Sequence, residues 1–206
     1  DIESESLTGG VPNAASRRAA LSGDALRLSY ASDASNLVAG DNNGRSDVFL
    51  RDRVSGTTTR VSAVAEALNP GGQESFSDPA IASDASVIAF TGSSGQVYAS
   101  VNGVGRRIST NANGAPGNGP SGRPMVAGSG GMVVFDSQAT NLLPGTDGNG
   151  AMSDIFIKDL ATGAVTLISR GANGVAADGP SQQPWASADG QAVVFSTRAS
   201  NLVSSD

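Results

Sequence analysis

Short apolar runs and polar, glycine-rich stretches alternate along the whole chain of 206 residues. The apolar runs are rich in β-branched and aromatic side chains, as in Val87–Phe90 and Ile155–Ile157. Runs of this kind, bounded by Gly, Pro, Asn, Asp and Ser, are typical of β-strands. No helical period of 3.6 residues persists over a useful window. The pattern predicts an all-β protein.

The same pattern recurs in four copies. A hairpin residue followed by an apolar strand occurs at Asp24, Asp84, Ser129 and Asp189, which are 60, 45 and 60 residues apart. In the three long copies, an Asn-Leu pair lies 12 residues after this anchor, and its asparagines are Asn36, Asn141 and Asn201. Constant offsets of this kind indicate a repeated supersecondary unit.

Each repeat contains signals for four antiparallel strands. A short strand that begins near a proline leads into a tight turn, of which Asp189-Gly190 is the strongest example, and a second strand follows. A third strand such as Val48–Leu50 and a glycine-containing turn lead to a fourth strand, which ends at a serine such as Ser109. Four strands in every 45–60 residues, repeated along the chain, are typical of the blades of a β-propeller.

The blade sequences resemble those of the TolB-like propellers, which are relatives of the WD-repeat blades. The resemblance covers essentially the whole chain and is carried by VVFS from Val193, IFIKDLATG from Ile155, LIS from Leu167 and ASNLVAGDNNGRSDVFLRDRVSGTTTRVS from Ala34. It implies a bacterial periplasmic or extracellular protein. Because propellers host many unrelated activities, the resemblance is specific for fold and implies no single function.

We expect one propeller segment over residues 1–206, with blades at about 19–62, 79–109 and 124–169 and a partial blade at 184–206. Residues 1–4 match the close of a fourth strand from a preceding blade. The resemblance implies a ring of six or more blades, and this chain holds about three complete ones. We therefore expect a piece of a larger propeller, or a protein that completes its ring with another chain, and a chain that does not close a ring alone.

Composition narrows the possible chemistry. Without histidine or cysteine the chain has no imidazole base, thiol nucleophile, disulfide, or metal bound by histidine or cysteine. The 13 basic and 19 acidic residues give a net charge of -6, and the basic side chains are scattered, which argues against nucleic-acid binding. No run of 18 apolar residues is present, so we expect no membrane span.

Two polar loops are candidate calcium sites. Calcium prefers oxygen ligands, usually including two or more carboxylates, with a glycine that permits a sharp turn. The loops DNNGRSD and DGNGAMSD resemble the tail of integrin-type calcium loops, and their candidate ligands are Asp41, Asn43, Asp47, Asp147, Asn149 and Asp154. The alternative is that these residues are turn formers that cap nearby backbone amides. No other cofactor is expected.

Residues that occur once are better candidates for a specific binding site than repeated ones. Arg17, Arg18 and Arg123 precede strand starts, in loops that a propeller displays on one face, and Trp185 is the single tryptophan. Arginine and aromatic side chains are enriched at binding hot spots. The alternative for Trp185 is packing between blades.

These observations favour a non-catalytic binding or scaffold propeller that recognises a protein, peptide or glycan through loops on one face. The alternative is an accessory or catalytic propeller of a secreted hydrolase or lyase that uses carboxylates. The four glutamates stand in no recognisable catalytic motif, and no catalytic residue is assigned.

Overall fold

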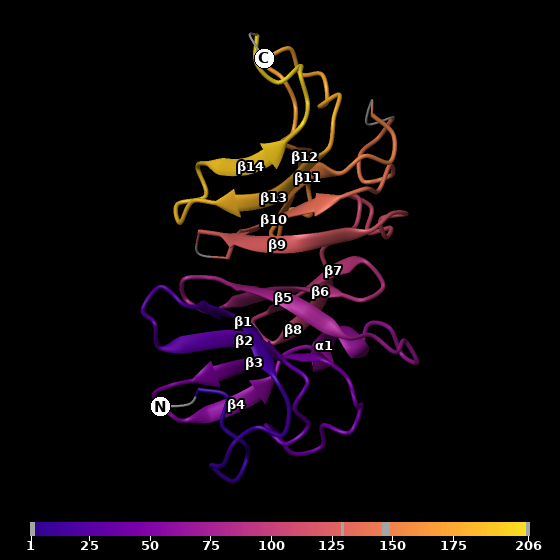
Figure 1. Ribbon diagram of the computed structural model, residues 1–206. Helices are drawn as coiled ribbons and strands as arrows, with labels where there is room; N and C mark the ends of the chain where they lie inside the picture. The colour runs from indigo at the N-terminus through magenta and orange to yellow at the C-terminus, as the bar shows by residue number, and fades with distance from the viewer. Residues whose placement is uncertain (1–2, 129, 146–148, 205–206) are drawn as a thin grey trace.

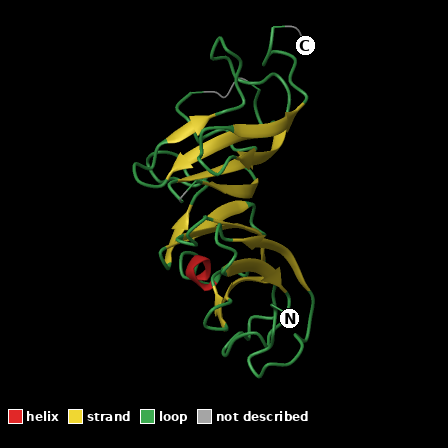
Figure 2. Ribbon diagram, turned by 90° about the vertical axis from the view of Figure 1, so that its left-hand side faces the viewer, coloured by secondary structure: helices red, strands yellow, loops and turns green. Residues whose placement is uncertain are grey.

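The computed structural model describes residues 3–128, 130–145 and 149–204, and within these ranges α1 (Ala63–Glu66) is the single helix. The strands form three antiparallel four-stranded sheets and one two-stranded sheet. This confirms the prediction of three complete propeller blades and a partial one. The sheets follow one another from the N-terminal to the C-terminal end of the molecule (Figures 1 and 2).

The strands pair in chain order within each sheet. The first sheet contains β1 (Ser16–Leu21), β2 (Arg27–Ser32), β3 (Asp47–Asp52) and β4 (Thr57–Arg60). The second contains β5 (Phe76–Ile81), β6 (Val87–Gly92), β7 (Gln96–Val101) and β8 (Val104–Arg107). The third contains β9 (Ser121–Ala127), β10 (Met132–Ser137), β11 (Asp154–Asp159) and β12 (Val165–Leu167). The last contains β13 (Ser181–Ala186) and β14 (Val193–Thr197).

The first strand of each sheet begins three residues before the boundary expected from the sequence pattern, as at Ser121 rather than residue 124. The same offset holds for β1, β5 and β13. In each case the strand passes through a register shift against its neighbour. The residue at this bulge leaves the ladder, and in three sheets a proline without an N–H follows it. Because the bulge and the proline interrupt the strand pattern, the sequence places the start of the strand after the bulge, although the strand begins before it.

Stacked aromatic pairs form the centre of each complete sheet. Tyr30 stacks on Phe49, Phe90 on Tyr98, and Phe135 on Phe156, with ring centroids 5.8, 6.3 and 6.0 Å apart. In every pair the two residues lie directly opposite each other on the second and third strands. All six rings are buried. Aliphatic side chains of the preceding sheet pack around the pairs of the second and third sheets, whereas Tyr30 and Phe49 pack with residues of their own repeat. The core therefore lies between successive sheets.

Aspartates close the first hairpin of the repeats. The Oδ1 atoms of Asp24, Asp84 and Asp189 each accept a hydrogen bond from the backbone N–H two residues further on. A neighbouring serine hydroxyl also donates to each carboxylate and holds its pKa below the ordinary value. These aspartates have a structural role, as their repetition suggested.

The N-terminal residues differ from the expectation. Glu3 and Ser4 lie in a bend rather than at the end of a strand, and Ile2 lies outside the described residues. The expected strand at residues 1–4 would be the fourth strand of a preceding blade and would pair with the third strand of that blade. Within the described chain, no strand precedes β1. The first and last sheets of the described chain share no strand.

Candidate functional site

The innermost strands carry the most unusual backbone in the molecule. Each has one non-glycine residue in the left-handed region, with φ of 55°, 52°, 48° and 56° at Arg18, Asp78, Arg123 and Gln183. Side chains rarely adopt this conformation, because Cβ crowds the following carbonyl oxygen. The four residues occupy the same bulge in successive sheets. The repeat therefore displays one irregular position on every inner strand.

The bulge residues form polar contacts within and between sheets. Arg18 forms an ion pair with Asp78, which joins the first sheet to the second. Arg123 Nη1 lies 2.6 Å from Asp136 Oδ2 within the third sheet. The same Asp136 oxygen accepts the backbone N–H of Gln183 at 3.2 Å, which joins the third sheet to the last one. Charged side chains therefore line the inner strands in alternating sign.

A cavity of about 250 Å³ opens at this surface between the second and third sheets. It is lined by Asp78, Pro120, Ser121, Gly122, Arg123, Asp136, Gln138, Ser153 and Gln182. Burial raises the pKa of the Asp136 carboxyl, and the hydrogen bond from Arg123 opposes this rise. The Arg123 side chain is still 49 % exposed, so it can contact a ligand without breaking its ion pair. The cavity offers hydrogen-bond donors and acceptors in close proximity.

The structure brings two of the four predicted partner-binding residues into equivalent positions and separates the others. Arg18 and Arg123 occupy corresponding bulges. Arg17 is engaged by Asp33 at 2.9 Å and by the Ser46 hydroxyl at 3.1 Å. Trp185 lies near the far end of β13, directly opposite Val194 on β14, and both are 64 % exposed.

The equivalent residues of the third sheet indicate the role of the sheet face on which Trp185 lies. Met125 and Val134 form the corresponding pair in the third sheet, where they pack against Ala186 and Phe195 of the last sheet. Trp185 and Val194 therefore lie on the face through which one sheet packs on the next. This placement favours the packing alternative for Trp185.

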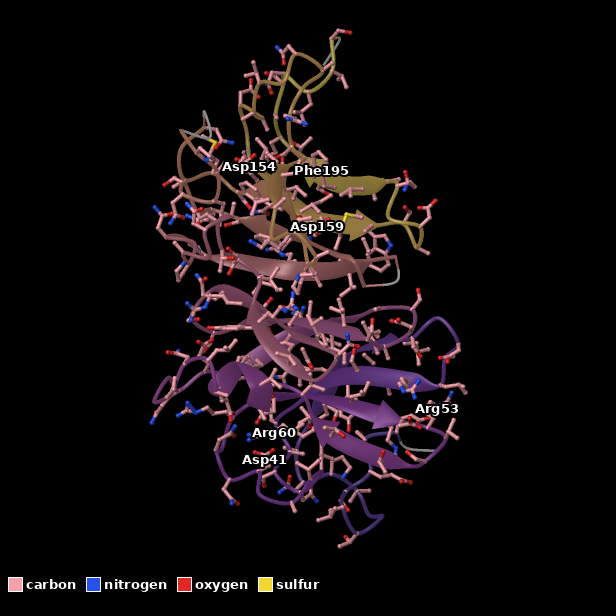
Figure 3. The ribbon with its side chains drawn as sticks, turned by 180° about the vertical axis from the view of Figure 1, so that it is seen from behind. Asp41, Arg53, Arg60, Asp154, Asp159 and Phe195 are labelled. Atoms are coloured by element: carbon pink, nitrogen blue, oxygen red, sulfur yellow. The ribbon has the colours of Figure 1, made fainter. Side chains whose placement is uncertain are left out.

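The first candidate calcium loop folds back onto the end of the first sheet. Asn43 Nδ2 donates to Asp47 Oδ2 at 2.7 Å and to Glu66 Oε1 at 3.0 Å. Asp41 is buried, and Arg60 Nη1 lies 3.6 Å from its Oδ1 (Figure 3). Burial raises the pKa of the Asp41 carboxyl, and the negative charge of Asp47 adds to the rise. Glu66, which comes from α1, was not foreseen from the sequence.

The second candidate loop is described only in part. Asp147 lies outside the described residues. Asn149 Nδ2 donates to the Ala177 carbonyl oxygen at 2.8 Å, and Asp154 Oδ1 accepts the Ser169 hydroxyl at 2.6 Å. In the described part of the chain, no three acidic side chains are placed to hold a metal ion together.

The repeated asparagines bind the preceding inter-sheet loop. Asn141 Nδ2 donates to the Pro116 carbonyl oxygen, and its Oδ1 accepts the backbone N–H of Asn118, both at 2.9 Å. Asn36 and Asn201 make the corresponding pairs of bonds. In each long repeat, this arrangement holds the loop after the second strand against the loop that precedes the sheet. It also explains why these asparagines recur in every long repeat.

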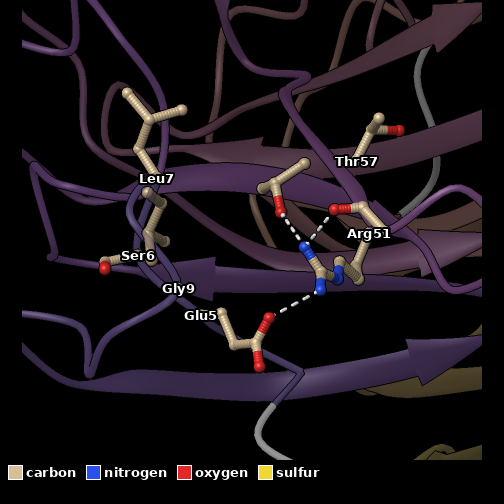
Figure 4. Close-up of a pocket in the computed structure, with 9 residues that line it drawn as sticks. Glu5, Ser6, Leu7, Gly9, Arg51 and Thr57 are labelled. Atoms are coloured by element: carbon tan, nitrogen blue, oxygen red, sulfur yellow. Dashed lines mark hydrogen bonds and ion pairs between the residues drawn. The ribbon is translucent and has the colours of Figure 1, made fainter.

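A second cavity, of about 360 Å³, lies between the N-terminal segment and the outer strands of the first sheet. Arg51 lies at its wall and donates to Glu5 Oε2 at 2.9 Å, to Gly56 O at 2.6 Å and to Thr58 Oγ1 at 3.2 Å (Figure 4). These bonds occupy two of the guanidinium nitrogens. They hold the N-terminal segment to the sheet, so we assign this arginine a structural role.

Comparison with solved structures supports the fold. The chain is similar to TolB from Acinetobacter baumannii, with a TM-score of 0.54 and 18 % identity over 91 % of this chain and 39 % of that one. A prolyl endopeptidase matches with a TM-score of 0.54 and 12 % identity over 89 % of this chain and 26 % of the other. An oligogalacturonate lyase in complex with manganese matches with a TM-score of 0.52 and 9 % identity over 95 % of this chain and 65 % of the other. The protein has the fold of a TolB-like β-propeller.

No protein-family model matches the sequence, and comparison with curated proteins gives no match either. The chain spans less than two thirds of the length of each of the structures named above. Within the described residues, no helix has the length and apolar character needed to cross a membrane.

Proposed function

We propose that this chain is a non-catalytic binding module that recognises a protein or peptide segment on the surface formed by its inner strands. One observation carries this proposal. The left-handed bulge recurs on every inner strand, but its side chains differ from sheet to sheet, and two of the charged ones, Asp78 and Arg123, line the adjoining cavity. Strained backbone that a fold maintains is often associated with a functional site.

The chemistry of this surface suits a peptide. A peptide presents backbone donors and acceptors together with charges of either sign. The side chains of Arg123 and Asp136 offer both a cation and an anion at the cavity, and nearby serine and glutamine side chains add neutral partners. Paired charges of this kind contribute more to specificity and association rate than to raw affinity. We therefore expect modest affinity with clear charge selectivity.

A catalytic role has one observation in its favour. The cavity contains two carboxylates, Asp78 and Asp136, and a pair of carboxyl groups can hydrolyse a glycosidic bond. Both are ion-paired with arginines, Arg18 and Arg123. Burial raises the pKa of Asp136, as a proton donor requires, but the hydrogen bond from Arg123 opposes this rise and the ion pairs engage both carboxylates. Binding therefore remains the better supported function.

The location of the protein belongs to the same proposal. A periplasmic or extracellular site of action rests on the resemblance of the repeats to bacterial TolB-like propellers. Fusion of the chain to a reporter enzyme that is active only outside the cytoplasm would test it in a bacterial host.

A peptide library displayed on phage, selected on the immobilised chain, tests the binding role. We expect enriched peptides whose affinity falls at least tenfold in Arg123→Ala and is unchanged in Arg198→Ala. Arg198 is an exposed arginine outside the cavity and serves as the matched control. A selection without enrichment, or peptides that bind both variants equally, would contradict the proposal. Turnover of an oligosaccharide that Asp136→Asn abolishes would establish the catalytic alternative.

A further inference from the structure

Three carboxylates surround one guanidinium at the end of the first sheet. Arg60 Nη1 lies 3.6 Å from Asp41 Oδ1 and 3.3 Å from Asp47 Oδ2, and Arg60 Nη2 lies 3.1 Å from Glu66 Oε2. Three negative charges against one positive charge leave this cluster at -2. Asp41 and Asp47 are almost completely buried, with side chains 2 % and 0 % exposed. Water therefore screens their repulsion poorly.

Asp41 differs from the other two acids because neither of its carboxylate oxygens meets a donor at good hydrogen-bond geometry within the described chain. The backbone N–H of Asn43 lies close enough to oppose the rise in its pKa, and no side chain donates to it. Asp47 accepts hydrogen bonds from Asn43, Ser62 and Arg60. Glu66 accepts hydrogen bonds from Asn43 and Arg60. A buried carboxylate without donors is costly unless a cation compensates its charge. The 3.6 Å separation from Arg60 is too long for a hydrogen bond. Both oxygens remain available to a ligand.

The other long repeat shows a related feature. Asn149 corresponds to Asn43 in the second loop, and its Oδ1 is buried and accepts no hydrogen bond within the described chain. The short repeat lacks the loop, because a tight turn replaces it and Gln96 stands at the position of Asp47. Both loops therefore contain a buried side-chain oxygen without a donor, at Asp41 in the first and at Asn149 in the second.

We propose that loop 41–47, together with Glu66 of α1, binds one calcium ion, which takes over from Arg60 the neutralisation of the three carboxylates. Calcium is favoured because the ligands within reach are oxygens, namely carboxylates and backbone carbonyls. Asn43 directs its Nδ2 toward Asp47 and Glu66, so its amide would have to turn over to offer an oxygen as well. Gly44, at φ 68°, permits the turn that brings these oxygens together. The ion links the loop after β2 to the segment after β4.

The guanidinium accounts for the present spacing of the acids. Arg60 lies among the three carboxylates and bonds Glu66 with both terminal nitrogens, which keeps Glu66 from approaching Asp41 and Asp47. The described acids are accordingly not grouped around one point. Calcium binding therefore requires Arg60 to swing away, and its side chain is 18 % exposed and can reach solvent.

Titration of the metal-stripped chain with calcium chloride, by calorimetry and by thermal melting, tests the site. At a hundred times the dissociation constant, the melting midpoint should rise by about 5–10 °C relative to a sample in chelator. Asp41→Asn should remove one binding site from the titration, without lowering the midpoint in chelator, because it removes a buried charge. Asp33→Asn, which changes an exposed carboxylate outside residues 41–47 in the same connection between β2 and β3, should retain the full response.

Two further variants separate a metal site from a purely structural cluster. Glu66→Gln should weaken calcium affinity about tenfold or more. Arg60→Gln should lower the midpoint in chelator, because the carboxylates lose their cation, and calcium should restore it. Equal midpoints of the natural chain in calcium and in chelator would overturn the proposal. So would a calcium response that Asp41→Asn leaves undiminished, or an Arg60→Gln defect that calcium does not repair.

Discussion

The ammonium nitrogen of Lys158 lies 3.2 Å from the carbonyl oxygen of Thr110 and 3.1 Å from its hydroxyl oxygen. A third bond runs to the carbonyl oxygen of Asn111 at 3.1 Å. Lys158 belongs to β11 of the third sheet, whereas its acceptors follow β8 of the second. Burial of the ammonium group lowers the pKa of Lys158. Lys158, the single lysine of the chain, therefore connects the third sheet to the second through hydrogen bonds.

Removing the hydrogen bonds of Lys158 should destabilise the protein. Lys158→Met keeps the aliphatic stem but leaves the buried acceptors without a donor, and we expect a loss of about 1–3 kcal/mol in the free energy of unfolding. Lys158→Arg should cost less, because Arg51 stands at the equivalent position of the first sheet and binds Glu5. Denaturant unfolding measures both variants. A methionine variant as stable as the natural chain would show that the three bonds contribute nothing net.

The asparagines of the Asn-Leu pairs should stabilise the preceding inter-sheet loops through their side-chain hydrogen bonds. Asn141→Ala removes the bonds to the Pro116 carbonyl and the Asn118 amide, and should cost about 1–2 kcal/mol while exposing the Asn118 amide to faster hydrogen exchange. Asn42→Ala, at an exposed loop position, should stay within about 0.5 kcal/mol of the natural chain. Equal effects of the two substitutions would argue against this role.

Gly119 should tolerate no side chain. A Cβ at this position would lie 2.6 Å from the carbonyl oxygen of Gln138 and 2.8 Å from its carbonyl carbon, both of which are backbone atoms. Gly119→Ala should therefore cost about 1–3 kcal/mol through forced backbone movement. Gly131 is the matched control, since an added Cβ there meets nothing within 4 Å. If thermal melting shows similar losses for both alanine variants, the close approach does not limit position 119.

The pKa of Asp136 should depend on Arg123. Burial raises the pKa of this carboxyl above 3.8, and the hydrogen bond from Arg123 lowers it. Arg123→Gln should therefore raise the pKa further, which carboxyl-carbon NMR can follow, with Asp24 as an unaffected reference in the same spectrum. Between the ordinary and the folded pKa, the native state binds more protons than the unfolded state. Stability should fall as pH rises through this window, and the window should widen in the variant.

An unchanged Asp136 titration in Arg123→Gln would contradict this assignment. It would mean that the 2.6 Å ion pair does not persist in solution. Loss of peptide binding in the same variant would then need another explanation than a changed charge at Asp136.

Much of the fold was predictable because strand signals are local. Alternating β-branched and aromatic residues, tight-turn residues and constant offsets placed the second and third strands of each repeat where the structure has them, as at Phe135 and Phe156. The sequence pattern also placed the hairpin aspartates in tight turns, and their backbone hydrogen bonds reach only two residues along the chain. These features depend on neighbours in sequence, which a repeat presents several times.

The tertiary structure alone decided the rest. Nothing adjacent to Asp136 or Glu66 in the sequence marks them, and they became site residues because folding placed Arg123, Asn43 and Arg60 against them. The left-handed bulges were hidden for a similar reason, since their conformation is held by strand pairing on either side of the bulge and, at Gln183, by a hydrogen bond to Asp136 of the preceding sheet. Burial and charge pairing depend on distances through space, between residues that the sequence separates.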